Sequence, residues 1–178
     1  MNLKTTRIIS SIGIFLLCFL FHFVYEIFPS TLTAIFFPVN ESIWEHVKLI
    51  FTGIVFYGII DYIILNKFHI KYNNFLYSLF VSSITSIPIF LSLYMPLFFK
   101  VGPKMWANFS VMGAVIIISQ VISYNIKKKK KYKSSNYIPL TLLVITYIVL
   151  AYLTYNPPKN RIFFDTQDEK YGINNYNV

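Results

Sequence analysis

The sequence has few charged residues: only 13% of its 178 residues are Asp, Glu, Lys or Arg. An average soluble domain has about 25%. Acidic residues are scarcest, with 7 Asp and Glu against 16 Lys and Arg, and Cys18 is the single cysteine. Hydrophobic residues make up 56% of the chain. These values exclude intrinsic disorder, a coiled coil, a disulfide scaffold and a typical cytosolic enzyme, and they indicate a small polytopic membrane protein.

The basic residues lie in short gaps between apolar runs. The formal net charge is +9, and six lysines fall between Lys127 and Lys133. A basic excess can indicate nucleic-acid binding, but cationic loops beside apolar spans usually set membrane orientation and contact anionic lipid headgroups. We therefore expect the lipid bilayer as the partner, with anionic headgroups at the Lys127–Lys133 loop, and no nucleic acid. The sequence identifies no protein partner.

Five apolar stretches are long enough to cross about 30 Å of hydrocarbon. They cover residues 8–28, 40–65, 74–98, 105–126 and 137–155. The prediction is an all-α fold with a single helical transmembrane domain over residues 1–156 and a tail over residues 157–178. Pro88 is expected to kink the third helix, and Pro96 to begin its end.

The positions of the lysines predict the orientation. With five spans, the N-terminal Lys4 and Arg7, the loop with Lys67 and Lys71, and the six-lysine block all lie on one side. Because positive loops favour the cytoplasm, we predict a multi-pass protein of the cell membrane with a cytoplasmic N-terminus and an extracytoplasmic C-terminal tail.

Ionisable residues cluster in the first two predicted spans. Four of the seven acids and two of the three histidines lie there, namely Glu26, Glu41, Glu45, Asp61, His22 and His46. Ionisable groups are costly in hydrocarbon, so such a cluster is a functional-site hypothesis. His22 and His46 each lie six residues from the outer end of a predicted helix, or about 9 Å deep. We therefore expect both histidines in one outer pocket.

This pocket has the residue types of a metal or polar-ligand site. Imidazole and carboxylate ligands suit Zn²⁺, Mn²⁺ and Fe²⁺. The candidate metal ligands are His22, His46, Glu26 and Glu45, the candidate ligand-binding residues are Asn40, Ser42, Glu26 and Lys48, and the candidate catalytic residues are Glu45 and Glu41.

A structural role for the same residues is the alternative. Lys48 is spaced to pair with Glu41 or Glu45, and His22 to pair with Glu26. Asn40 has the position of a helix N-cap, and Glu41 that of a first-turn acid. These interpretations stay open at the level of sequence.

Two residues outside this cluster have separate predictions. Asp61 lies at the other end of the second helix, where we expect it to pair with Lys67. Asp165 and the neighbouring aromatic residues of the tail are expected to fold back over the outer mouth of the pocket.

The sequence resembles a family of small uncharacterised membrane proteins from Gram-positive bacteria. The resemblance depends on the segment Phe37-Pro38-Val39-Asn40-Glu41-Ser42-Ile43-Trp44-Glu45-His46-Val47-Lys48-Leu49, on His22-Phe23-x-Tyr25-Glu26, and on Pro157-Pro158, Phe164-Asp165 and Tyr171-Gly172-Ile173 in the tail. The resemblance implies an architecture and indicates which residues are characteristic of the family, but it implies no activity.

Three functions are compatible with these features. The first is an outer-facing His/Glu pocket that binds a metal ion or a small polar ligand, with metal-dependent hydrolysis as its enzymatic form. The second is a component of a proton-coupled transporter, with the carboxylates as a relay. The third is an accessory subunit whose polar residues contact a partner's helices.

Overall fold

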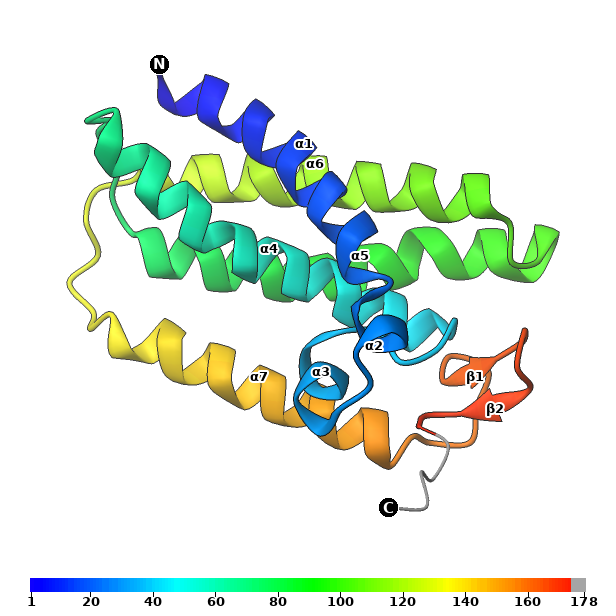
Figure 1. Ribbon diagram of the computed structural model, residues 1–178. Helices are drawn as coiled ribbons and strands as arrows, with labels where there is room; N and C mark the ends of the chain where they lie inside the picture. Colours follow the sequence, from blue (N-terminus) through cyan, green and yellow to red (C-terminus); the bar gives the residue numbers. More distant parts are fainter. Residues whose placement is uncertain (174–178) are drawn as a thin grey trace.

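The computed structural model describes residues 1–173, and five long helices form its body (Figure 1). They are α1 (Leu3–Phe21), α4 (Ile43–Lys67), α5 (Phe75–Val101), α6 (Met105–Lys128) and α7 (Tyr137–Tyr155). Two short helices, α2 (Val24–Ile27) and α3 (Thr31–Phe36), lie between α1 and α4. The tail contains an antiparallel hairpin of β1 (Phe164–Asp165) and β2 (Lys170–Tyr171).

The bundle has two distinct ends. Helices α2 and α3 and the β-hairpin gather at one of them, which we call the tail end (Figure 1). The N-terminus and the connections 68–74 and 129–136 lie at the opposite end, which we call the lysine-rich end. The sequence predicted a ligand site near the start of α4 and a basic surface at the lysine block. These two regions lie at opposite ends of the long helices (Figure 1).

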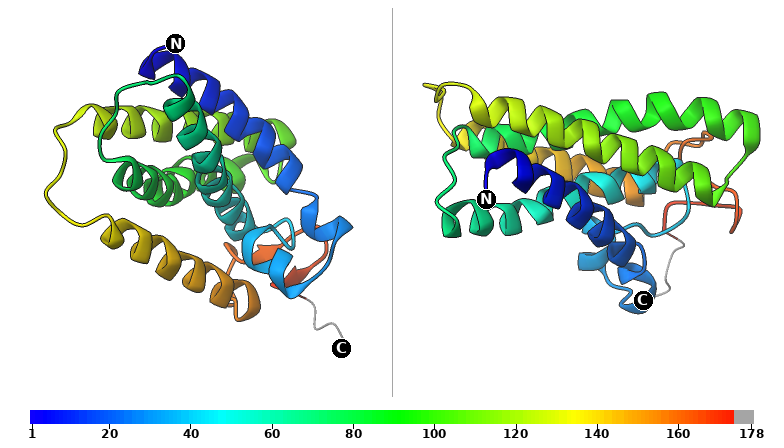
Figure 2. Two further views of the ribbon diagram at one scale, coloured as in Figure 1. Left: turned by 60° about the vertical axis from the view of Figure 1, so that its left-hand side comes forward. Right: turned by 90° about the horizontal axis from the view of Figure 1, so that it is seen from above.

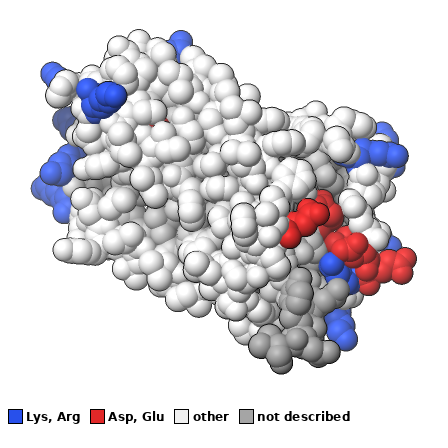
Figure 3. All heavy atoms as spheres, viewed as in Figure 1, with Lys and Arg blue, Asp and Glu red and all other residues white. Residues whose placement is uncertain are grey.

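The surface between the two ends is apolar. Leu20 on α1 and Ile148 on α7 are both 63% exposed, and the face seen in Figure 3 carries its charged residues towards the ends. Soluble proteins rarely expose apolar surface on this scale. Five helices are long and apolar enough to cross a membrane, with α1 and α2 together forming one span over Leu3–Ile27. The predictions of an all-α fold and of five membrane-spanning helices are confirmed.

Four of the long helices pack into one core. Helix α5 packs along α6, α4 contacts α1 and α5, and α1 also contacts α6. Ile50, Phe90 and Val115 are almost fully buried between them. Gly53 lets α4 approach α1 closely, because a Cβ at this position would collide with the Cys18 thiol. Helix α7 lies to one side and contacts α3 and α5 (Figure 2).

The first span ends close to where it was predicted, at Ile27, but its helical hydrogen bonding is interrupted at His22 and Phe23. Two other predictions are wrong. Helix α4 begins at Ile43 rather than at Asn40. Pro96 does not begin the end of α5, which continues to Val101. Proline is tolerated within membrane helices, since neighbouring groups satisfy the freed carbonyls. The helix ends at Gly102, whose φ of 75° lies in the left-handed region that favours glycine.

Helix α3 was not predicted from the sequence. Its signal is a capping box, in which the Ser30 hydroxyl accepts from the Thr33 backbone N–H while the Thr33 hydroxyl accepts from the Ser30 N–H. This exchange satisfies two donors that would otherwise be free at the helix start. Helix α3 returns the chain towards α4 and so positions the segment that carries Glu41.

Candidate metal centre at the tail end of the bundle

His22 lies at the C-terminal end of α1. It is the C-cap of that helix, and its backbone N–H donates to the Cys18 carbonyl. The helical hydrogen bonding then breaks at Phe23, and α2 starts as a separate helix. His22 and Glu26 therefore do not share one continuous helix face, and Glu26 is exposed.

Glu41 lies in a connecting segment that is fixed on several sides. The Val39 N–H donates to the Glu45 carboxylate at 3.1 Å, and the Ser42 N–H donates to the Asn40 side chain at 2.9 Å. Ser42 is the N-cap of α4, because its hydroxyl accepts from the Glu45 N–H. This role takes the place of the N-cap that was predicted at Asn40. Three hydrogen bonds thus hold the backbone on both sides of Glu41.

The tail folds back onto the same segment. The buried Asp165 carboxylate accepts a hydrogen bond of 2.9 Å from the Glu41 N–H, and Asn40 donates to the Gly172 carbonyl. The Trp44 N–H donates to the Ile162 carbonyl, and the rings of Trp44 and Phe163 lie 4.9 Å apart. The tail therefore stabilises the start of α4 through Asp165 and its aromatic neighbours.

Three side chains converge in front of this segment. His22 Nε2 lies 3.2 Å from Glu41 Oε1, and His46 Nε2 lies 3.7 Å from Glu41 Oε2. The two imidazole rings have centroids 5.7 Å apart. One ligand atom from each residue lies within 4.8 Å of the others, and this is the group in residues 1–173 that could hold a metal ion. We call His22, Glu41 and His46 the His/Glu cluster.

The orientation of His46 is fixed by a backbone carbonyl. His46 Nδ1 lies 2.9 Å from the Ser42 carbonyl oxygen, which can only accept a hydrogen bond. The proton of a neutral His46 is therefore on Nδ1, and Nε2 presents a lone pair to the Glu41 carboxylate. Histidine ligands of metals commonly donate their other N–H to a carbonyl in this way.

The charge of Glu41 suits a cation. Its hydrogen bond with His22 holds the pKa of the Glu41 carboxyl below its ordinary value, against the opposing effect of burial. The nearby imidazoles act in the same direction. The side chains of His22 and Glu41 are 29% and 31% exposed, so water and small solutes reach the cluster. The site thus combines an ionised carboxylate with two imidazoles and an open face.

Glu45 and Lys48 belong to a separate buried network. Lys48 Nζ lies 2.6 Å from Glu45 Oε2 and donates to the Ala34 carbonyl and the Thr154 hydroxyl. Thr154 in turn donates to Glu45 Oε1 at 2.9 Å. Of the pairings left open by the sequence, the structure has the one between Glu45 and Lys48. This network joins α4 to α3 and α7, and it does not bring Glu45 into the His/Glu cluster.

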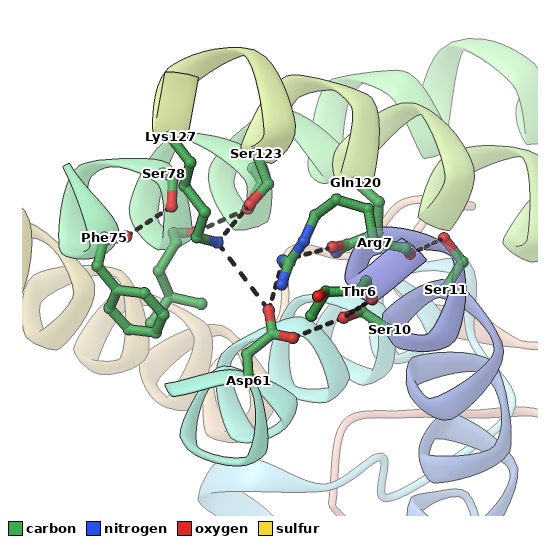
Figure 4. A network of polar contacts seen from close by, with 12 residues as sticks. Thr6, Arg7, Ser10, Ser11, Asp61, Phe75, Ser78, Gln120, Ser123 and Lys127 are labelled. Atoms are coloured by element: carbon green, nitrogen blue, oxygen red, sulfur yellow. Dashed lines mark hydrogen bonds and ion pairs between the residues drawn. The ribbon is translucent and has the colours of Figure 1, made fainter. Parts of the chain in front are cut away.

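A second cluster of charges lies at the lysine-rich end (Figure 4). Arg7 forms an ion pair with Asp61 and donates to Gln120 at 3.1 Å. Ser10 donates to Asp61 Oδ1 at 2.6 Å, and Lys127 Nζ lies 4.0 Å from Asp61 Oδ2, the oxygen that also pairs with Arg7. The predicted pair between Asp61 and Lys67 is therefore wrong. Asp61 faces the bundle, where α1 and α6 supply buried cations, whereas Lys67 is exposed at the end of α4.

Sequence reasoning treated these residues singly and so missed their convergence. Gln120, Ser123 and Lys127 are spaced at i, i+3 and i+7, which places them on one face of α6. Arg7 and Ser10 have the same i, i+3 relation on α1. The polar face on each of these two apolar helices could have indicated a buried polar contact. The spacing within a helix, however, does not determine which helices pack against each other.

The chain belongs to a family of unknown function, DUF6512, which matches residues 1–173. No curated protein and no solved structure matches the chain. The family match covers all the described elements, from α1 through the β-hairpin, so the membrane-spanning helices and the tail form part of one family unit.

Proposed function

We propose that this protein binds a divalent transition-metal ion at the outer membrane surface through His22, Glu41 and His46. The observation that carries the proposal is the placement of His46, whose Nδ1 is held by the Ser42 carbonyl while Nε2 faces an ionised carboxylate at 3.7 Å. Two groups with lone pairs that face each other are satisfied by a shared cation: a proton on Nε2 gives an ion pair, and a metal ion in its place gives coordination by both groups. Two imidazoles and one carboxylate are a common ligand set for Zn²⁺ and Fe²⁺, and they also accept Mn²⁺.

Three protein ligands leave coordination positions for water or substrate, as in catalytic zinc sites. A metal-bound water is a nucleophile at neutral pH, so the reaction class would be hydrolysis at the lipid-water boundary. Glu26 is exposed on α2, next to the helix end that carries His22, and is the candidate general base. Glu45 and Lys48 would support the site by holding the backbone at Val39 and α3.

The positions of the two polar clusters favour a metal site over a proton relay. Arg7 and His22 are fifteen residues apart on α1, which corresponds to about 22 Å of helix. The positions between them that face the core include Ile14 and Cys18, both almost fully buried. A relay needs polar groups at hydrogen-bond spacing, and these apolar contacts interrupt it.

The test is the metal content of the detergent-purified protein after reconstitution with Zn²⁺, Mn²⁺ or Fe²⁺. We expect near-stoichiometric metal in the wild type, and its loss in His22→Ala, Glu41→Gln and His46→Ala. His69→Ala is the matched control, because His69 is exposed beyond the end of α4 at the other end of the bundle. A wild-type protein that takes up none of the three metals, or a His69→Ala variant that loses metal equally, would overturn the proposal.

A further prediction concerns Asp165. Its carboxylate accepts from the Glu41 N–H and, through the other oxygen, from the Gln167 N–H at 2.8 Å. Asp165→Ala is expected to weaken metal affinity about 10-fold to 100-fold, the usual effect of losing a group that orients a ligand. Isothermal titration with Zn²⁺ measures this change.

Asp168→Ala is the control for Asp165→Ala. Asp168 lies in the same tail, but its side chain is 59% exposed and pairs with Lys170. We expect wild-type affinity in Asp168→Ala. Equal affinities in both variants would show that the tail does not orient Glu41.

A further inference from the structure

A groove opens at the lysine-rich end, between α4, α5 and the connection 129–136. Its volume is about 730 Å³, within the range of small-ligand sites. A second cavity of about 490 Å³ is adjacent to it, since Tyr72 and Asn73 line both. We call the two together the lysine-end groove.

The lining of the groove changes from apolar to basic. Ile59, Leu76 and Leu79 line it along the membrane-spanning parts of α4 and α5. Its other lining residues include hydroxyl and amide groups and four lysines, Lys71, Lys127, Lys128 and Lys131, and no acidic residue lines either cavity. The groove thus has an apolar part and a part lined by lysines, tyrosine hydroxyls and amides. This lining is complementary to a lipid, which has an acyl chain below a phosphate headgroup.

The adjoining charge cluster contains two buried basic side chains and one acid. Arg7 and Lys127 are 5% and 2% exposed, and Asp61 is the acid that faces them (Figure 4). Nε and Nη2 of Arg7 are buried without a hydrogen-bond partner among the described residues. An uncompensated charge is costly within a bilayer. Lys127 also lines the groove, so an anion bound there would lie beside this cluster.

The first half of helix α7, which follows the connection 129–136, exposes apolar side chains. In its first half, Ile138, Val144 and Ile145 are between 48% and 53% exposed, and the connection 129–136 spans the separation between α6 and α7 (Figure 1). Ile59 in the groove wall is 65% exposed. The apolar part of the groove is therefore open sideways, in the direction from which a membrane lipid enters.

We propose that the lysine-end groove is a binding site for one anionic phospholipid. The phosphate lies among Lys71, Lys128 and Lys131, and one acyl chain lies along Ile59 and Leu79. Basic pockets between membrane helices are known to hold anionic headgroups. The proposal differs from diffuse attraction of lipids to a basic loop, because it requires one lipid, a defined position and a contribution from both the headgroup and the chain.

The experiment is native mass spectrometry of the full chain in detergent, titrated with dioleoyl phosphatidylglycerol, dioleoyl phosphatidylcholine or inorganic phosphate. We expect one equivalent of phosphatidylglycerol to bind in preference to phosphatidylcholine. The double variant Lys71→Gln/Lys131→Gln is expected to bind it about 30-fold more weakly, since each lysine near the headgroup contributes about a factor of five.

The matched control is Lys100→Gln/Lys104→Gln, which removes the same charge at the opposite end of α5 and the start of α6. We expect it to keep wild-type binding of phosphatidylglycerol. Equal loss in both double variants, equal binding of phosphatidylcholine, or phosphate that competes as well as the lipid would each overturn the proposal. Equal loss in both double variants would indicate diffuse attraction to positive charge. Equal binding of phosphatidylcholine would indicate an unselective apolar surface, and competition by phosphate would indicate a simple anion site.

Discussion

The Asp61→Asn variant is expected to lose about 3–5 kcal/mol of free energy of unfolding, the usual cost of removing one partner from a buried ion pair. The substitution keeps the size of the side chain and a hydrogen-bonding oxygen for Ser10. It removes the negative charge that faces Arg7 and Lys127, both of which are buried. Two cations would then remain in the bundle without a counter-ion. Equilibrium unfolding in mixed detergent micelles measures the loss.

Two further variants separate the charge effect from a general sensitivity to mutation. Asp168→Asn removes an exposed acid and should leave the unfolding free energy within about 0.5 kcal/mol of wild type. Arg7→Met/Asp61→Asn removes both partners of the ion pair and should be more stable than Asp61→Asn alone. If Asp61→Asn unfolds like the wild type, the buried ion pair does not stabilise the bundle.

The second large effect is expected for Lys48→Met. Lys48 has no exposed surface and is the cation that balances Glu45, which is 1% exposed. Methionine has a similar length but no charge, so Glu45 would be left as a buried carboxylate with hydrogen bonds only from the Val39 N–H and the Thr154 hydroxyl. We expect a loss of about 3–5 kcal/mol in the free energy of unfolding.

A double variant tests whether this loss comes from the unpaired charge. Glu45→Gln/Lys48→Met has neither charge and should recover part of the stability that Lys48→Met loses. Lys67→Met, at the exposed end of the same helix, is the control and should unfold like the wild type. A double variant that is no more stable than Lys48→Met would assign the loss to the hydrogen bonds of Lys48 to Ala34 and Thr154.

The two buried ion pairs have different relations to the proposed metal centre. The pair of Glu45 and Lys48 contacts the backbone on either side of the turn that leads to Glu41, so its loss is expected to disturb the His/Glu cluster as well as the fold. The pair of Arg7 and Asp61 lies at the other end of the bundle. Measurements of metal content and stability on the same variants therefore distinguish a local effect on the site from a global effect on the bundle.

Much of the architecture could be predicted from the sequence. Length and apolar composition determine which stretches can cross a membrane, because the bilayer leaves few alternatives to a helix. His22 and His46 were each six residues from the outer end of a predicted helix, and this equal depth predicted that they would lie close together. The centroids of their rings are 5.7 Å apart. The spacing of Glu45 and Lys48 likewise allowed a pair within one helix, and that pair forms.

The choice of carboxylate at the candidate site was not predictable in the same way. From the sequence, Glu26 and Glu45 were candidate metal ligands, and Glu41 was a candidate catalytic residue or a first-turn acid of the second helix. The structure instead brings Glu41 to the histidines, since the segment before α4 is not helical and the tail and Glu45 hold its backbone. Hydrogen bonds between segments more than a hundred residues apart decide this geometry, and no local pattern encodes them.

The sequence by itself thus determined the number of long helices, their approximate limits and the pairs of ionisable residues that share a helix. These properties depend on hydropathy and on the helical repeat, which are local. Only the tertiary structure decided that Asp61 pairs with Arg7 rather than with Lys67, and that Glu41 faces His22 and His46. Which residues pair between different helices depends on which helix faces pack together. Many faces have similar polarity, and the fit of all the side chains at once decides which of them pack.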